Sequence, residues 1–232
     1  MISVVVPVFN EAENMSILQA ELRDALGNRD YEIVFVDDGS SDGTADKIDK
    51  SDSRMRVLRF EKNAGQSAAT YAGLNAARGD IVVLIDGDLQ TDAADIPKLL
   101  DALNDDVDLV CGYRIGRQDT WFKRVQSRIA NYVRSRFTKD GVRDTGCGMK
   151  AMRRECVSAI VPFKGMHRFV PALVKGAGYR LTEVPVRHRA RRFGESKYGK
   201  HGFRGRALRA TIDMFGVRWL LSRQLKYKVR GE

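Results

Sequence analysis

The sequence contains few cysteines and few histidines, three of each in 232 residues. The cysteines are odd in number and no two have CxxC spacing, which argues against a disulfide framework and against a zinc site. This usage fits a reducing cytoplasm. The histidines are scattered without metal-ligand spacing, so we interpret them as structural residues. The cysteines are Cys111, Cys147 and Cys156.

Long apolar runs are also missing. No stretch of roughly 18 or more apolar residues occurs, so the sequence predicts no transmembrane helix. The opening residues 2–7 lack a basic start and a small-residue cleavage site, so they do not resemble a signal peptide. With 43% hydrophobic residues, the chain is ordinary for a globular protein, and its length fits one domain with or without an appendage.

Charge is divided unevenly along the chain. Residues 1–112 contain 22 Asp and Glu against 10 Lys and Arg, a net charge of −12. Residues 113–232 contain 8 against 30, a net charge of +22. A basic half can bind nucleic acid, an anionic membrane or phosphorylated substrates. Aromatic stacking platforms and a nucleic-acid-binding motif are missing, so we expect no nucleic-acid partner.

Short β-branched runs alternate with helical patterns in the first hundred residues. The apolar runs 3–8, 32–36 and 81–85 are typical of strands buried on both faces, as in parallel sheets. Helical patterns occupy residues 13–25 and 65–77 between them. This alternation predicts an α/β fold with a doubly wound sheet. Further elements are expected as helices at 95–103 and 122–137 and strands at 108–111 and 179–189.

Polar and acidic residues follow each of these three strands. They are residues 10–11 (Asn-Glu), 37–38 (Asp-Asp) and 86–90 (Asp-Gly-Asp-Leu-Gln). Ligands of open α/β sheets bind beyond the carboxyl ends of the strands. We therefore expect the three acidic strand ends to face one ligand site.

The third strand end has the composition of a divalent-cation site. Asp86 and Asp88 alternate after a strand, which places their side chains on one side of the backbone, and Gln90 offers a neutral oxygen. Mg²⁺ commonly takes one or two carboxylates and completes its shell with substrate phosphates and water. The alternative is a solvated turn, which the neighbouring acidic strand ends make less favourable. For Asp37 we expect hydrogen bonds from a base or ribose, whereas residues 40–44 are interpreted as a turn with a helix cap.

Two short motifs resemble nucleotide-binding signatures and are rejected. Residues 146–151 match GxGxxA, but no apolar strand precedes them and no acidic residue follows at the required distance. Residues 194–200 match most of a P-loop, but His201 stands where a Ser or Thr should bind the metal. The sequence therefore predicts neither a dinucleotide-binding dehydrogenase nor a P-loop NTPase.

Several motifs taken together resemble a known family. In the acidic half they resemble glycosyltransferase family two, of GT-A fold: Val4–Glu11 (VVVPVFNE), Val36–Ser40 (VDDGS) and Asp86–Gln90 (DGDLQ). In the basic half they resemble its dolichyl-phosphate mannose synthase and polyprenyl-phosphate glycosyltransferase branch: Gly112–Arg114 (GYR), Asp144–Gly146 (DTG) and Arg192–Tyr198 (RFGESKY). The resemblance covers about residues 2–200 and is specific as a combination.

The resemblance implies a role for each matched residue. The nucleotide-sugar donor would be held by Pro7, Asn10, Glu11, Asp37 and Asp86. The metal, Mg²⁺ or Mn²⁺, would be bound by Asp86, Asp88 and Gln90. The acceptor phosphate would be received by Arg114, Arg124 and Ser127, and by a closing loop with Arg192, Ser196 and Lys197. Asp144 would stand near the reacting centre as a base or a positioning group, so that Asp86, Asp88 and Asp144 form the catalytic set.

The implied activity is inverting transfer of a sugar from a GDP- or UDP-linked donor to a polyprenyl phosphate at the cytoplasmic face of a membrane. Residues 1–200 would form the GT-A catalytic domain, with a nucleotide-sugar half at 1–112 and an acceptor half at 113–200. Residues 201–232 would form a basic tail. Two alternatives remain open. One is transfer to a sugar hydroxyl, and the other is a basic binding or scaffold module without activity.

We expect residues 204–230 to form an amphipathic helix that lies in the membrane interface without crossing it. Leu208, Ile212, Phe215 and Trp219 would form its apolar face, and the Lys and Arg residues around them can meet anionic headgroups. Alternatively, this face packs on the protein's own core or on a second subunit in a homo-oligomer. Many members of the branch continue into transmembrane helices, so attachment here is expected to be peripheral or through a membrane-protein partner.

Overall fold

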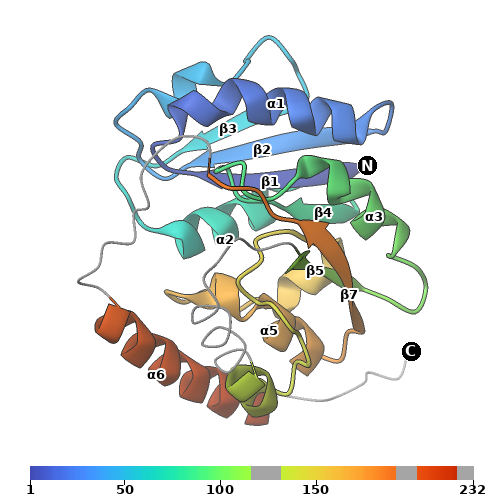
Figure 1. Ribbon diagram of the computed structural model, residues 1–232, viewed down its shortest axis with the longest axis vertical. Coiled ribbons are helices and arrows are strands. Elements are labelled where there is room, and N and C mark those ends of the chain that lie inside the picture. Colours follow the sequence, from blue (N-terminus) through green and yellow to red (C-terminus); the bar gives the residue numbers. More distant parts are fainter. Residues whose placement is uncertain (116–131, 192–202, 224–232) are drawn as a thin grey trace, which may run out of the picture.

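The computed structural model describes residues 1–115, 132–191 and 203–223, with only the backbone of residues 203–208. Within these residues a seven-stranded sheet has the order β3-β2-β1-β4-β6-β5-β7 (Figure 1). The strands are β1 (Ile2–Val8), β2 (Tyr31–Asp37), β3 (Met55–Arg59), β4 (Ile81–Leu84), β5 (Leu109–Ile115), β6 (Lys150–Arg153) and β7 (Leu181–Arg187).

The strands of this sheet run in one direction except for β6. β1 pairs in parallel with β2 and β4, β2 with β3, and β5 with β7, whereas β6 is antiparallel to β4 and β5. The carboxyl ends of the parallel strands therefore share one edge of the sheet, and β6 begins at that edge with Lys150. The predicted α/β sheet is confirmed, with one reversed strand that the sequence did not show.

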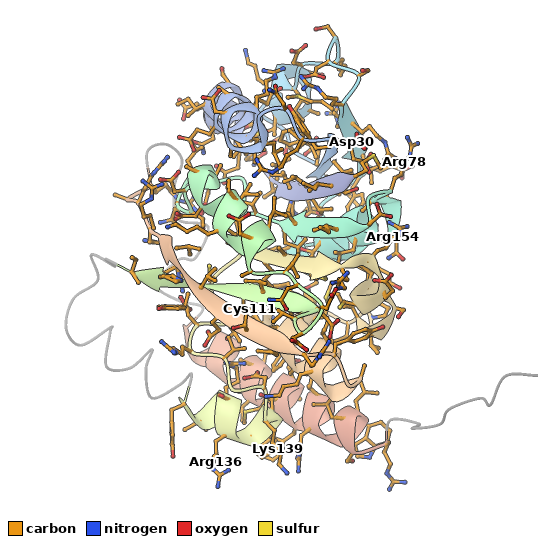
Figure 2. The ribbon with its side chains drawn as sticks, turned by 90° about the vertical axis from the view of Figure 1, so that its right-hand side faces the viewer. Asp30, Arg78, Cys111, Arg136, Lys139 and Arg154 are labelled. Atoms are coloured by element: carbon orange, nitrogen blue, oxygen red, sulfur yellow. The ribbon has the colours of Figure 1, made fainter. Side chains whose placement is uncertain are left out.

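The side-chain alternation of β1 explains why helices cover both faces of the sheet. Val4 and Val6 point into a core with α1 (Ala12–Leu26) and α3 (Ile96–Asp101), and Val5 points into a second core with α2 (Gln66–Ala76) and α5 (Val170–Gly176). A strand with both faces buried needs a continuous apolar run rather than an alternating one. Cys111 lies deep in the second core, as Figure 2 shows.

Helix α2 lies close to the sheet because it carries a glycine at the contact. A Cβ atom at Gly73 would stand 2.3 Å from Cγ1 of Val5 and 3.0 Å from Cγ2 of Val36. The backbone of α2 can approach β1 and β2 only while residue 73 has no side chain. This packing fixes the start of α2, which faces the carboxyl edge of the sheet.

The last described helix, α6 (Phe203–Ser222), lies beside α5 (Figure 1). The sequence predicted one apolar face, but α6 has two. Met214, Val217 and Leu221 pack against the second core, whereas Ile212 and Trp219 on the opposite side are 59% and 63% exposed. The apolar face predicted from the sequence, which includes Ile212 and Trp219, is therefore not the face of α6 that packs on the core. In the described part of the chain every helix is too short or too polar to cross a bilayer.

Candidate active site

The loops after β1 and β2 hold each other at the carboxyl edge of the sheet. Asn10 adopts a left-handed backbone conformation (φ 52°), and its N–H donates to Oγ of Ser40 at 2.9 Å. Its side-chain oxygen accepts from the N–H of Ser41 at 2.9 Å. The N–H of Glu11 donates to Oγ1 of Thr44 at 2.9 Å. Residues 40–44 therefore form a structural turn, as the sequence suggested, and this turn presents Asn10 and Glu11.

Asp37 lies at the end of β2 with its side chain fully buried. Oδ1 accepts from the N–H of Ser40 at 2.9 Å. Oδ2 is 3.5 Å from Nε of Arg59 but has no hydrogen-bond partner among the described residues. A buried carboxylate oxygen without a hydrogen bond is unfavourable by about 1–3 kcal/mol. Such an oxygen at a strand end can accept a hydrogen bond from the base or ribose of a nucleotide.

The neighbouring Asp38 has a different task. Its carboxylate accepts from the backbone N–H groups of Ala64 at 2.7 Å and Gly65 at 2.9 Å, and from the side chain of Asn63 at 2.9 Å. These bonds hold the loop that leads into α2. Asp38 thus orders the segment from which Gln66 reaches the site.

Asp86 follows β4 and is enclosed by protein on two sides. Oδ1 accepts from Nε2 of Gln66 at 3.0 Å. On the other side Gly148 leaves room for the carboxylate, because a Cβ atom there would stand 2.1 Å from Oδ2. Burial and the nearby charge of Asp88 raise the pKa of Asp86 to about 6, although Lys150 and Arg114 oppose the shift. A cation beside the two carboxylates would offset the negative charge that raises the pKa of Asp86.

A tight turn presents the second carboxylate. Leu89 has φ 58° with its side chain buried in the core, a conformation that a leucine rarely adopts and that is often found at functional sites. The turn brings the N–H of Gln90 to Oδ1 of Asp88 at 3.1 Å. In the described part of the chain no three His, Cys, Asp or Glu side chains form a metal cluster. Mg²⁺ commonly takes one or two protein carboxylates and its other ligands from phosphates and water, which is compatible with the pair of Asp86 and Asp88.

Arg191 joins two of the acidic strand ends. Its Nη2 is 2.8 Å from Oδ2 of Asp88, and its Nη1 is 3.9 Å from Oε1 of Glu11. The ends of β1 and β4 therefore face one guanidinium, as expected from strand ends that share a ligand site. No role was predicted for Arg191 from the sequence.

Arg114 and Asp144 form a two-bond ion pair next to these carboxylates. Nε of Arg114 is 2.7 Å from Oδ2 of Asp144, and Nη2 is 2.9 Å from Oδ1. A Cβ atom at Gly146 would stand 2.7 Å from Nη2 of Arg114. One loop thus places Gly146 against Arg114 and Gly148 against Asp86. Arg114, which was predicted to receive the acceptor phosphate, and Asp86 of the predicted cation site are therefore neighbours.

Of the remaining predicted site residues, the structure describes Pro7 but not the others. Pro7 lies in β1 opposite Val36. Five predicted acceptor residues lie outside the described residues: Arg124, Ser127, Arg192, Ser196 and Lys197.

Sequence reasoning missed three residues of the site: Gln66, Lys150 and Arg191. Lys150 is buried and donates to the carbonyl of Cys147 at 2.5 Å, so it braces the loop that leads from Asp144 to β6. A lysine between Met149 and Ala151 in an apolar run was a signal for it, because lysine is rarely buried without a partner.

Residues 3–161 match the family described as Glycosyl transferase family 2. The chain belongs to glycosyltransferase family 2. It is 38% identical over 205 residues to undecaprenyl-phosphate 4-deoxy-4-formamido-L-arabinose transferase of Edwardsiella ictaluri, covering 85% of this chain and 63% of that protein. It is 35% identical over 239 residues to dodecaprenyl-phosphate galacturonate synthase of Rhizobium johnstonii, covering 99% of this chain and 68% of that protein. These relatives match the predicted polyprenyl-phosphate branch, and the chain spans about 63% of the length of the first.

The fold of this chain is also that of solved structures. Glucosyl-3-phosphoglycerate synthase from Mycobacterium tuberculosis, in complex with Mn²⁺, UDP and glucosyl-3-phosphoglycerate, superposes with a TM-score of 0.70 at 22% identity. The match covers 94% of this chain and 79% of that one. The predicted GT-A fold is thereby confirmed.

Proposed function

We propose that this glycosyltransferase moves a sugar, with inversion, from a nucleoside-diphosphate sugar to a polyprenyl phosphate. The observation that carries the proposal is that acidic side chains and an arginine ion pair lie next to each other in the candidate site. The acidic end of β4, at Asp86, lies beside the Arg114–Asp144 pair across the loop of Gly146 and Gly148. The carboxylates suit a metal-bound diphosphate, and the guanidinium of Arg114 suits a phosphate acceptor. Both relatives named above act on polyprenyl phosphates by name.

The donor nucleoside would lie over the ends of β1 and β2. Asp37 has a buried oxygen available for a base or ribose, and Pro7, Asn10 and Glu11 form the adjoining edge. A cation, Mg²⁺ or Mn²⁺, would be held by Asp86 and Asp88, with Gln90 as the third ligand. When bound, it supplies charge neutralisation of the leaving diphosphate. A solved structure of the same fold contains Mn²⁺ and UDP; whether GDP or UDP is the donor here is a matter for the assay below.

The acceptor would be bound as a dianion beside Arg114. A phosphate monoester has a second pKa of about 6, so its attacking oxygen is already ionised at neutral pH. That oxygen forms the bond to the anomeric carbon, the bond to the donor oxygen breaks, and the nucleoside diphosphate leaves. No proton has to be removed. Because both oxygens of Asp144 bind Arg114, we assign Asp144 as a positioning residue for that guanidinium rather than as a base.

The division of labour along the chain follows from this assignment. Residues 1–112 would form the nucleotide-sugar half and residues 113–200 the acceptor half, with the tail of 201–232 outside the catalytic domain. A basic acceptor half keeps a phosphorylated lipid close to a donor site that would otherwise repel it. The lipid acceptor remains in the bilayer, so the enzyme would work at the cytoplasmic face of the membrane.

A product-partition assay tests the proposal. The purified chain is incubated with labelled UDP- or GDP-sugars, Mn²⁺ and a polyprenyl phosphate, and the mixture is extracted with organic solvent. We expect label in the organic phase, dependent on the lipid phosphate and lost with EDTA. Label that moves only to a water-soluble saccharide would favour the sugar-hydroxyl alternative. Absence of transfer from every donor would contradict the proposal.

A further inference from the structure

Three arginines occupy alternate positions from the last residue of β7 onward: Arg187, Arg189 and Arg191. We call them the arginine ladder. Nε of Arg187 is 3.2 Å from Asp92, and Arg189 is 2.5 Å from Asp92 and 2.6 Å from Glu21. These pairs fasten the segment to α1 and to the turn before α3. The third member of the ladder, Arg191, differs because it pairs with Asp88 and Glu11 of the candidate active site.

Arg191 covers one particular oxygen of the cation site. Oδ1 of Asp88 accepts from the N–H of Gln90, and Oδ2 is bound by Arg191 at 2.8 Å. The same guanidinium is 3.9 Å from Glu11. The Arg191 and Asp88 side chains are 22% and 18% exposed, so their charges are only partly screened by water. Arg191 therefore offsets negative charge in a group of carboxylates that also includes Asp86.

We propose that Arg191 is the counter-ion that a divalent cation displaces from Asp88, and that this residue thereby sets the cation affinity of the site. The inference rests on the proposed role of Asp86 and Asp88 as cation ligands. A cation and a guanidinium that need the same carboxylate oxygen bind in competition. The loss of the Arg191–Asp88 ion pair is then part of the free energy of cation binding. The other members of the ladder keep their partners, because neither contacts Asp88.

Cation binding to the full chain without nucleotide tests this competition. Mn²⁺ is titrated, and free Mn²⁺ is followed by electron paramagnetic resonance. Removing the competitor with Arg191→Gln should tighten Mn²⁺ binding roughly three- to tenfold, the size expected for a partly buried ion pair. Arg191→Lys keeps the positive charge and should bind Mn²⁺ nearly as the wild type does. The matched control is Arg189→Gln, which also removes two ion pairs and should leave Mn²⁺ affinity unchanged.

The outcomes separate this inference from the function on which it rests. If Asp88→Asn abolishes Mn²⁺ binding but Arg191→Gln leaves it unchanged or weaker, the competition is refuted and the cation site stands. If Asp88→Asn binds Mn²⁺ like the wild type, the proposed cation site itself is wrong.

A second measurement needs no substitution. Phenylglyoxal modification of Arg191, mapped by mass spectrometry, should become faster when Mn²⁺ is added, while modification of Arg189 should not. An unchanged rate at Arg191 with Mn²⁺ bound would overturn the inference.

Discussion

The partly buried carboxylate of Asp86 is expected to oppose folding when it is charged. Its side chain is packed between Gln66 and Gly148, and burial together with Asp88 raises its pKa to about 6 from the usual 3.8. Folding therefore favours the protonated form of Asp86. Its contribution to stability is full below about pH 4 and is lost as the pH rises through about 6.

The first prediction is that Asp86→Asn stabilises the metal-free protein at pH 8 while abolishing sugar transfer. The amide has no charge to bury, and its oxygen can still accept from Gln66. We expect a gain of about 1–3 kcal/mol at pH 8 and almost none at pH 4, where Asp86 is also neutral. Urea unfolding at the two pH values measures the difference. Equal stability at pH 8 would show that the charge of Asp86 does not oppose folding.

The second prediction is that Asp88→Ala abolishes transfer and metal-dependent donor binding but leaves the fold intact. Asp88 is partly exposed at the edge of the sheet, so its removal uncovers little of the core. Loss of a group that holds the charge-neutralising cation should lower the rate by at least about a hundredfold. Transfer assays and circular dichroism check the two parts. Normal turnover by the variant in the presence of EDTA would exclude a metal role for this residue.

The third prediction is that Arg114→Ala or Arg124→Ala impairs transfer to the lipid phosphate more than nucleotide binding. For Arg114 the structure adds a stability loss of about 3–5 kcal/mol, because the largely buried charge of Asp144 would lose its two-bond ion pair with this guanidinium. Nucleotide affinity by calorimetry is compared with acceptor kinetics. If nucleotide affinity falls while acceptor kinetics stay unchanged, the arginine belongs to the donor site instead.

At the scale of elements, long-range pairing decided which strands could be predicted. β1, β2 and β4 are buried on both faces, and such strands leave continuous β-branched runs in the sequence. β3 lies at the edge of the sheet and its short apolar segments are interrupted by Arg56 and Arg59, and β6 has only four residues and begins with a lysine. Neither gives a local apolar run, so their positions depend on partners far away in the chain.

The prediction of the candidate site was likewise limited by contacts between residues far apart in the chain. Motifs at strand ends were recognisable because each lies within a few residues of its strand. Gln66 lies 20 residues from Asp86, and Arg191 lies 103 residues from Asp88. Their contacts depend on the packing of α2 and on the path of the chain after β7. No local pattern encodes either of these.

The fourth prediction concerns the packing of α2 on the sheet. Gly73→Ala places a Cβ atom 2.3 Å from Val5, and this overlap should outweigh the gain of about 1 kcal/mol in helix propensity. We expect a net loss of about 1–3 kcal/mol. Gly216→Ala in α6 is the matched control, since nothing lies within 4 Å of its added Cβ, and it should stabilise. Thermal unfolding of both variants measures this, and a stabilised Gly73→Ala would contradict the close packing.

At the scale of the whole molecule, α6 and the helical residues 132–138 contact each other and both carry exposed apolar side chains, which we call the apolar surface. The rings of Phe137 and Phe215 meet at 4.9 Å. The exposed apolar side chains of this surface are Tyr132 (70%), Val133 (51%), Ile212 (59%), Phe215 (58%) and Trp219 (63%). Figure 2 shows Arg136 and Lys139 at the outer end of the molecule. Exposed aromatics next to basic residues are typical of a surface that rests in the headgroup region of a membrane.

The fifth prediction is that this surface binds anionic membranes without crossing them. Removal of the whole tail would be a poor test, because Val217 fills the core and Asp213 pairs with Arg168 at 3.2 Å. Substituting only the exposed side chains avoids that damage. The double variant Ile212→Ser and Trp219→Ser should keep the fold but lose flotation with anionic liposomes. The wild type should float and should be released at high salt, since each basic residue contributes roughly 1 kcal/mol at such a surface. Sedimentation of the same variants separates a membrane contact from the alternative of a second subunit. If the double variant still floats but a wild-type dimer becomes a monomer, the surface is a subunit interface.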